Sequence, residues 1–203
     1  MKITWNGHAC FSVDTAQGSL VFDPYADHYV PGLSPLSLTA DLVLCSHGHN
    51  DHNAADIVRL TGSEPSFTVE SFSTFHDPEQ GALRGTNTVH ILCAEGMRVA
   101  HLGDLGCELT AEQLEQLKGL DAVMIPVGGF YTIDATQAMA LVEQIHPKVV
   151  IPMHYRSDSF GYPVLGTVED YTALCSDAVC YEGNTLELTP ETKSQTAVLT
   201  YCG

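Results

Sequence analysis

The feature that most constrains this chain is a short apolar run that ends in a cluster of histidines. The run Leu42–Cys45 is followed at once by Ser46-His47-Gly48-His49-Asn50-Asp51-His52. Such a run is typical of a buried strand, and polar residues at its end are displayed on a loop. Imidazoles and carboxylates are the ligands of borderline divalent metal ions. The chain is therefore expected to carry a metal site at a strand end.

The spacing inside this cluster suggests two ions. His47 and His49 alternate, so the end of the strand can direct both at one ion. Asp51 and His52 lie beyond the turn, where they can bind a second ion about 3.5–4 Å away. Zinc is the first candidate for both positions, and manganese or iron are alternatives. The competing interpretation is a solvated histidine-rich turn without metal.

The rest of the chain alternates short strands with helices. Predicted strands near the start are Ile3–Trp5, Cys10–Val13 and Ser19–Phe22, separated by Asn-Gly and Gln-Gly turns. Later predicted strands are Thr88–Leu92, Arg98–Leu102, Ala122–Pro126, Val149–Met153, Leu186–Leu188 and Ala197–Tyr201. Helices are predicted over Asn53–Leu60 and after the capping residues Thr110, Asp134 and Thr167. Early hairpins followed by β-α-β units predict an α/β fold with a pair of mixed sheets and helices outside.

Length and charge limit the organisation and the partners. A chain of 203 residues without a low-complexity linker predicts one domain over residues 1–203. The net charge of −17 argues against nucleic acid and anionic membranes, which demand clustered basic residues. Runs such as Val149–Ile151 are far shorter than the ~20 residues of a membrane span. A small-molecule substrate is the expected partner, and the oligomeric state is left open.

Seven cysteines are scattered without tight spacing, at positions 10, 45, 93, 107, 175, 180 and 202. The spacing of Cys175 and Cys180 lies outside the usual range for zinc sites. An odd number of cysteines, with no secretory signal at the start, predicts reduced thiols and a cytoplasmic protein.

The histidine cluster resembles the signature of the metallo-β-lactamase superfamily. Further motifs follow in order: Gly7-His8-Ala9, Asp23-Pro24, His76-Asp77, Arg84-Gly85-x-Asn87-Thr88, His101-Leu102-Gly103-Asp104-Leu105-Gly106, Pro126-Val127-Gly128-Gly129 and Ile151-Pro152-Met153-His154-Tyr155. Together they resemble the branch of small metal-dependent hydrolases related to L-ascorbate-6-phosphate lactonase. The resemblance implies a four-layer αββα sandwich with the metals at one edge of the two sheets.

The resemblance also implies a complete ligand set. His47, His49 and His76 would bind the first ion, Asp51, His52 and His154 the second, and Asp104 would bridge both. Asp104 and His154 each follow a predicted strand, which displays their side chains. His90 and His101 are rival imidazoles for the place of His76. His90 lies in mid-strand, and His101 is better placed as a supporting hydrogen-bond donor.

Further residues are candidates for supporting the metals or binding substrate: His8, Asp23, His101, Tyr155, Arg84 and Arg156. Asp23 could accept a hydrogen bond from the free nitrogen of a ligand histidine. Arg84 or Arg156 could hold an anionic substrate group, and Tyr155 could donate to a developing oxyanion. The alternative roles are ordinary turn residues and surface arginines.

These residues predict a hydrolase in which two ions activate a bridging water as hydroxide, with Asp51 holding it and accepting its proton. The expected substrate is a small lactone, ester or phosphoester. One alternative is a non-catalytic metal-binding protein on the same fold. The other is a diiron redox relative; such relatives usually place a glutamate where His49 stands and work with a flavin domain.

Overall fold

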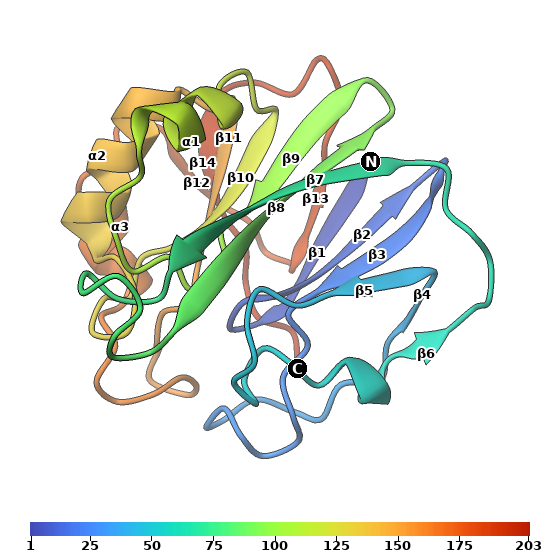
Figure 1. Cartoon of the computed structure of the whole chain (residues 1–203), viewed down its shortest axis with the longest axis horizontal. Coiled ribbons are helices and arrows are strands. Elements are labelled where there is room, and N and C mark those ends of the chain that lie inside the picture. Colours follow the sequence, from blue (N-terminus) through green and yellow to red (C-terminus); the bar gives the residue numbers. More distant parts are fainter.

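Two β-sheets face each other in the computed structural model, which describes residues 1–203 (Figure 1). The five-stranded sheet has the order β13 (Thr185–Glu187), β1 (Lys2–Gly7), β2 (Cys10–Thr15), β3 (Gly18–Phe22) and β5 (Leu42–Leu44). The seven-stranded sheet has the order β12 (Ala178–Cys180), β14 (Gln195–Val198), β11 (Val149–Met153), β10 (Ala122–Pro126), β9 (Met97–His101), β8 (Thr86–Ala94) and β7 (Thr68–Phe75). The short strands β4 (Thr39–Ala40) and β6 (Arg59–Leu60) form a separate pair.

The three α-helices lie together on the outer side of the seven-stranded sheet (Figure 1). They are α1 (Ala111–Gln116), α2 (Ala135–Ile145) and α3 (Val168–Thr172). Thr110 and Asp134 cap α1 and α2 through capping boxes, as their sequence predicts. At α3 the Asp170 carboxylate accepts the N–H of Thr167 at 2.8 Å. The predicted starts of these helices are confirmed.

The helix expected over residues 53–60 is wrong. This segment forms one 3₁₀ turn, η1 (Ala55–Ile57), and then enters strand β6. No side chain caps the turn, and Val58 is already extended. The N–H of Arg59 donates instead to the carbonyl of Leu38 at 2.9 Å. Pairing with a distant strand therefore outweighs the local helix signal, and a loop with this single turn covers the outer side of the five-stranded sheet.

The main core fills the space between the two sheets and beneath the helices. It includes Ile3 and Trp5 from β1 and Phe11 from β2, all fully buried. All residues of β10 and β11 are buried, because parallel strands in this sheet are covered on both faces. This packing holds the two sheets rigidly together, so residues at their strand ends keep fixed relative positions.

All seven cysteines are free in the structure. None of the helices has the length and apolar character needed to cross a bilayer.

Candidate metal centre

The candidate ligand and support residues lie at the carboxyl ends of strands from both sheets. Each residue and the strand before it are His8 (β1), Asp23 (β3), His47 (β5), His76 (β7), Asp104 (β9) and His154 (β11). Because the two sheets face each other, these strand ends converge on one edge. Short loops after well-packed strands position side chains accurately, since the strands cannot shift.

The backbone is strained at three of these positions. His8, Asp23 and His154 have φ values of 52°, 45° and 55°. The left-handed region costs a non-glycine residue about 1–2 kcal/mol. Hydrogen bonds hold the conformation: the His8 carbonyl accepts from the His154 N–H at 3.2 Å and from Trp5 Nε1 at 3.0 Å. Strain of this kind is typical of functional sites, because it directs the side chain inward.

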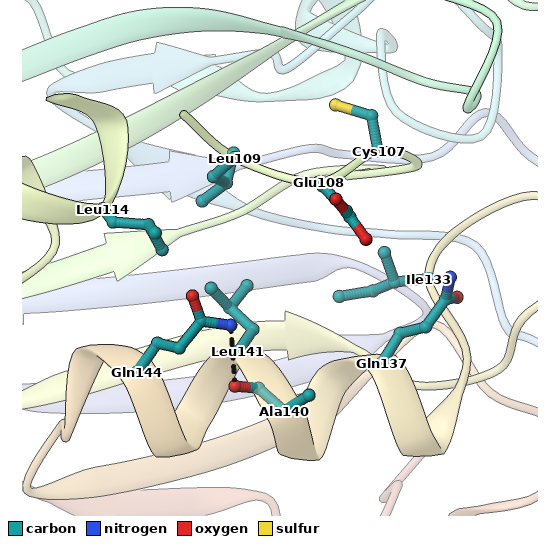
Figure 2. Close-up of a pocket in the computed structure, with 9 residues that line it drawn as sticks. All are labelled: Cys107, Glu108, Leu109, Leu114, Ile133, Gln137, Ala140, Leu141 and Gln144. Atoms are coloured by element: carbon teal, nitrogen blue, oxygen red, sulfur yellow. Dashed lines mark hydrogen bonds between the residues drawn. The ribbon is translucent and has the colours of Figure 1, made fainter. Parts of the chain in front are cut away.

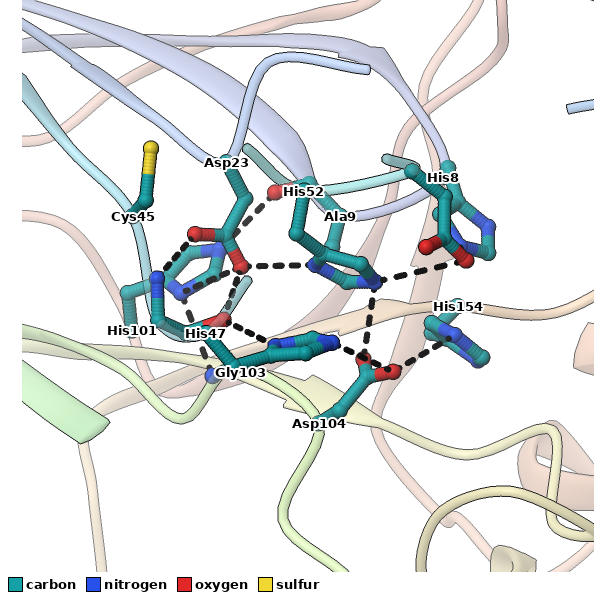
Figure 3. A network of polar contacts seen from close by, with 12 residues as sticks. His8, Ala9, Asp23, Cys45, His47, His52, His101, Gly103, Asp104 and His154 are labelled. Atoms are coloured by element: carbon teal, nitrogen blue, oxygen red, sulfur yellow. Dashed lines mark hydrogen bonds and ion pairs between the residues drawn. The ribbon is translucent and has the colours of Figure 1, made fainter. Parts of the chain in front are cut away.

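Asp104 contacts several histidines that come from different strand ends (Figure 3). Its Oδ1 is 3.2 Å from Nε2 of His52, and its Oδ2 is 3.2 Å from Nε2 of both His76 and His154. Nε2 of His47 is 3.8 Å from Oδ2. One carboxylate therefore faces imidazoles from both predicted ligand sets, which is the position that a bridging ligand requires.

Ligand-type side chains form three overlapping groups whose donor atoms lie within 4.8 Å of one another. The groups are His47, His49 and His76; His47, His52 and Asp104; and His8, Asp51, His52 and His154. The first and third groups contain the two predicted ligand sets. The third group also contains His8, which the sequence analysis named only as a candidate for supporting the metals or binding substrate.

His76, rather than its two rivals, lies beside His47 and His49. Both ring nitrogens of His90 are within hydrogen-bond distance of other groups, a serine hydroxyl at 2.8 Å and a backbone carbonyl at 3.3 Å. His101 is fully buried between a backbone carbonyl at 2.8 Å and the N–H of Gly103 at 3.1 Å. His90 and His101 therefore have no ring nitrogen free for a ligand role.

Asp23 and Ser46 orient two of the candidate ligands. The Asp23 carboxylate accepts the Ser46 N–H and the Ser46 hydroxyl, both at 2.6 Å, and lies 2.8 Å from Nδ1 of His52. The same hydroxyl is 2.9 Å from Nδ1 of His47. These contacts leave Nε2 of both imidazoles facing the cluster. Asp23 thus occupies the predicted supporting position, whereas sequence reasoning assigned no role to Ser46, although it directly precedes His47.

Sequence reasoning also assigned no role to Asn87, whose side chain positions Asp104. The Asn87 Oδ1 atom accepts the Asp104 N–H at 2.9 Å, and its Nδ2 donates to the Leu102 carbonyl at 2.9 Å. The side chain is fully buried in β8, next to the strand that carries Asp104. Its place in the Arg84-Gly85-x-Asn87-Thr88 motif was the available signal.

The electrostatics of the cluster keep its carboxylates ionised. Burial acts to raise the pKa of Asp104, but His154 and His52 outweigh it and hold that pKa well below its usual range. Burial likewise opposes ionisation of Asp23, yet the neighbouring histidines lower its pKa to about 2. For His47, burial and the nearby His52 lower the pKa to about 3, so this imidazole stays neutral. Ionised carboxylates and neutral imidazoles are the forms that bind metals.

Several buried donor atoms have no hydrogen-bond partner, which fits a metal centre. They are Nε2 of His47 and His52, Oδ1 of Asp104, both nitrogens of His8, and Nδ1 of His76 and His154. Buried polar atoms are normally paired, because an unpaired one costs about 1–3 kcal/mol. Unpaired imidazole and carboxylate atoms gathered in one buried cluster suit divalent ions such as zinc.

Comparisons with known proteins agree with this geometry. Residues 2–154 match the family model of the β-lactamase superfamily domain. The crystal structure of a candidate Zn-dependent hydrolase of the metallo-β-lactamase superfamily, from Thermotoga maritima, is 33% identical with a TM-score of 0.79. The match covers 98% of this chain and 97% of that one. This chain belongs to the metallo-β-lactamase superfamily.

Two further proteins extend the likeness. A UPF0173 metal-dependent hydrolase from Thermoplasma acidophilum is 30% identical over 214 residues, covering 86% of this chain and 95% of the relative. Igni18, a metallo hydrolase from Ignicoccus hospitalis, shares the fold with a TM-score of 0.67 at 22% identity, covering 93% and 99% of the two chains. The predicted family and fold are confirmed, and the chain is a metal-dependent hydrolase of the superfamily. The relation to the lactonase branch stays a prediction.

The metallo-β-lactamase site opens into a pocket of about 370 Å³. It is lined by Tyr29, His49, Asp51, His76, Arg84, Asp104, Tyr131 and Tyr162. The Tyr162 hydroxyl donates to Oδ2 of Asp51 at 3.4 Å, and burial raises the pKa of this phenol, which keeps it a donor. The three tyrosines were not singled out from the sequence, because they come from loops that only folding brings together.

Two predicted residues lie away from this pocket. Tyr155 is buried in the main core, where its ring packs 5.3 Å from that of Trp5 between centroids. Nε of Arg156 donates to the Leu165 carbonyl at 2.7 Å, and this arginine lines a different surface hollow. The proposed oxyanion role of Tyr155 and substrate role of Arg156 are therefore wrong, because the Tyr155 ring packs in the core and the Arg156 guanidinium is held at a different surface hollow.

A second hollow, of about 250 Å³, lies between residues 107–114 and helix α2 (Figure 2). Its lining is mostly apolar, and Glu108 is the only charged side chain in it. It lacks histidine, and Cys107 and Glu108 are its only titratable residues, so it has no chemistry comparable to that of the superfamily site.

Proposed function

We propose that this chain hydrolyses a small lactone, ester or phosphoester at two divalent metal ions, with zinc as the first candidate. The first ion would be held by His47, His49 and His76, the second by Asp51, His52 and His154, and Asp104 would bridge them. The bound ions would supply Lewis acidity and lower the pKa of water to near neutrality.

The observation that carries this proposal is the position of Asp104. Its two oxygens lie 3.2 Å from imidazoles of both ligand sets, with His52 on one oxygen and His76 and His154 on the other. A carboxylate placed between the two ligand groups would lower the repulsion between two cations. A single-ion site would need only one of these groups.

Asp51 is the residue best placed to orient the attacking water and accept its proton. Its Oδ2 lines the pocket, 3.4 Å from Nε2 of His8 and 3.4 Å from the hydroxyl of Tyr162. Burial opposes its ionisation, but His8 and His52 hold its pKa below the usual range. We propose that Asp51 accepts the proton of the water and relays it toward the leaving group.

His8 would support the second ion. Its imidazole is buried with both nitrogens unpaired, and burial together with His154 lowers its pKa to about 4. A neutral imidazole beside Asp51 can either bind the ion or donate to the carboxylate, and both actions would keep Asp51 oriented.

The substrate is proposed to be a small molecule, because the pocket volume suits a metabolite rather than a polymer. The acidic net charge of −17 disfavours nucleic acid. A cytoplasmic location is proposed from the free cysteines.

Metal analysis together with a substrate panel tests the proposal. The purified protein should contain about two ions per chain and hydrolyse at least one of a set of generic esters, lactones and phosphodiesters. Asp51→Asn should lower turnover by about 10²–10⁴-fold, the usual contribution of a general base. The exposed His28, changed to glutamine, serves as the matched control and should leave the rate unchanged.

Two outcomes would contradict the proposal. Two bound ions with no turnover on any substrate would favour the non-catalytic alternative. A redox-active diiron centre would favour the diiron redox alternative, although His49 stands where such relatives usually carry glutamate.

A further inference from the structure

The pocket contains one cation, and it has no partner. The guanidinium of Arg84 makes no ion pair and no hydrogen bond within the chain. Its recorded contact is the ring of Tyr131, whose centroid lies 5.5 Å from the guanidinium carbon. Acidic residues outnumber basic ones, 25 against 8, yet no carboxylate neutralises this guanidinium inside the pocket. Arg98, by contrast, bonds to Glu70 and to two backbone carbonyls.

The loop that carries Arg84 is built around one carboxylate. Asp77 accepts four backbone N–H groups: from Glu79 at 2.9 Å, Gly81 at 3.0 Å, Leu83 at 3.1 Å and Arg84 at 2.7 Å. The carbonyl of Gly85 accepts the N–H of His76 at 3.1 Å. The start and end of the loop are therefore tied together beside a candidate metal ligand, which fixes the position of Arg84 relative to the metal centre.

Aromatic side chains complete this part of the pocket. Tyr131 lies edge-on to Tyr162, with 6.1 Å between ring centroids, and its N–H donates to the Gly129 carbonyl at 2.7 Å. The stacked tyrosine holds the guanidinium plane by a cation–π contact and leaves the N–H fork free. A fork of this kind matches the two oxygens of a carboxylate or phosphate.

We infer that Arg84 and Tyr131 form a recognition subsite for an oxyanion on the substrate, separate from the bond that is hydrolysed. The inference rests on the proposed function, since it assumes that the reacting group lies at the metal ions. The substrate would then be a small lactone, ester or phosphoester that carries a second, anionic group. The acidic pocket wall formed by Asp51 and Asp104 would disfavour such a molecule unless cations are bound there.

The test measures binding of paired ligands to the zinc-loaded protein by calorimetry. Glutarate and monomethyl glutarate each offer one carboxylate to the metal, but only glutarate offers a second to Arg84. We expect glutarate to bind about 10–100-fold more tightly, the range for a charge-assisted hydrogen bond. Arg84→Gln should bring this ratio close to one, and Arg84→Lys should retain part of it because the charge remains. The control is Arg59→Gln, which removes an exposed arginine on β6 and should preserve the ratio.

A parallel arm uses 4-phosphonobutyrate in place of glutarate. The affinities of glutarate and 4-phosphonobutyrate are each compared between the wild type and Arg84→Gln. The ligand that loses more affinity in the variant shows whether the subsite prefers a carboxylate or a phosphate group. Equal ratios in the wild type and Arg84→Gln would overturn the subsite, even if the protein hydrolyses its substrates. A ratio of glutarate to monomethyl glutarate affinity that falls to about one in Arg84→Gln would support the subsite even if no hydrolysis were found. Failure of the subsite and failure of the proposed function are therefore distinguishable.

Discussion

Gly103→Ala is expected to destabilise the fold directly beneath the metal centre. Gly103 has a φ of 56°, and a Cβ atom there would lie 2.3 Å from Oδ1 of Asn87 and 2.4 Å from Cβ of Ser46. Asn87 holds Asp104, and Ser46 contacts Asp23. The added methyl group therefore disturbs both supports of the cluster at once.

The magnitude follows from two contributions. The left-handed backbone costs alanine about 1–2 kcal/mol. Forcing a methyl group into a filled site costs about 1–3 kcal/mol more, because the neighbours are buried and cannot move freely. The free energy of unfolding should fall by about 2–5 kcal/mol. Gly119→Ala is the matched control: its φ is 69° and nothing lies within 4 Å of its Cβ position, so only the backbone cost of about 1–2 kcal/mol applies.

Urea unfolding of both variants in the presence of a chelator measures the two costs. With a slope of about 3 kcal/mol per molar urea, the midpoint should fall by roughly 0.7–1.7 M for Gly103→Ala and by roughly 0.3–0.7 M for the control. Zinc affinity should also fall for Gly103→Ala and stay unchanged for Gly119→Ala. Equal midpoints for the two variants would refute the reasoning, because the close approach to Asn87 and Ser46 would then have no energetic effect.

Other predictions concern individual side chains. Asp104→Ala should lose both ions, whereas His154→Ala should keep about one, as measured by elemental analysis after gel filtration; two retained ions in Asp104→Ala would exclude the bridge. His76→Gln should weaken zinc binding by more than about 100-fold, above the usual loss for a supporting residue, while His90→Gln should bind zinc normally; titration with a competing chelator separates the two. At pH 8 iodoacetamide should leave Cys10 unmodified in the folded protein, because the side chain is fully buried and burial raises the pKa of its thiol; peptide mass spectrometry would show whether it reacts along with the exposed thiols.

The sequence was sufficient to predict those features whose signal lies in residues close together along the chain. The cluster from His47 to His52 is contiguous, so its chemistry is visible without the fold. Capping boxes at Thr110 and Asp134 likewise marked helix starts, since a cap depends on residues three positions apart. The failure at residues 53–60 has the same origin: a weak local helix pattern lost to the bond between Arg59 and the distant Leu38.

Roles that depend on the direction of a side chain required the tertiary structure. Tyr155 adjoins His154 in sequence, but successive side chains leave on opposite sides, and its ring packs in the core. Tyr162 occupies the pocket instead. The choice between Arg84 and Arg156 could not be made from composition, because it depends on which loop faces the metals.

The sequence by itself determined the family and the position of most strands, and it predicted the types of the metal ligands, because each depends on residue type and short-range spacing. Only the tertiary structure decided which side chains share the site. Asp104 and the histidines His52, His76 and His154 come from distant parts of the chain. In the folded structure a carboxylate oxygen of Asp104 lies 3.2 Å from Nε2 of each of the three histidines. Sequence reasoning assigned no role to Ser46, and only a motif pointed to Asn87, because their hydrogen bonds join neighbouring strands, β3 with β5 and β8 with β9, whose pairing is established only in the folded structure.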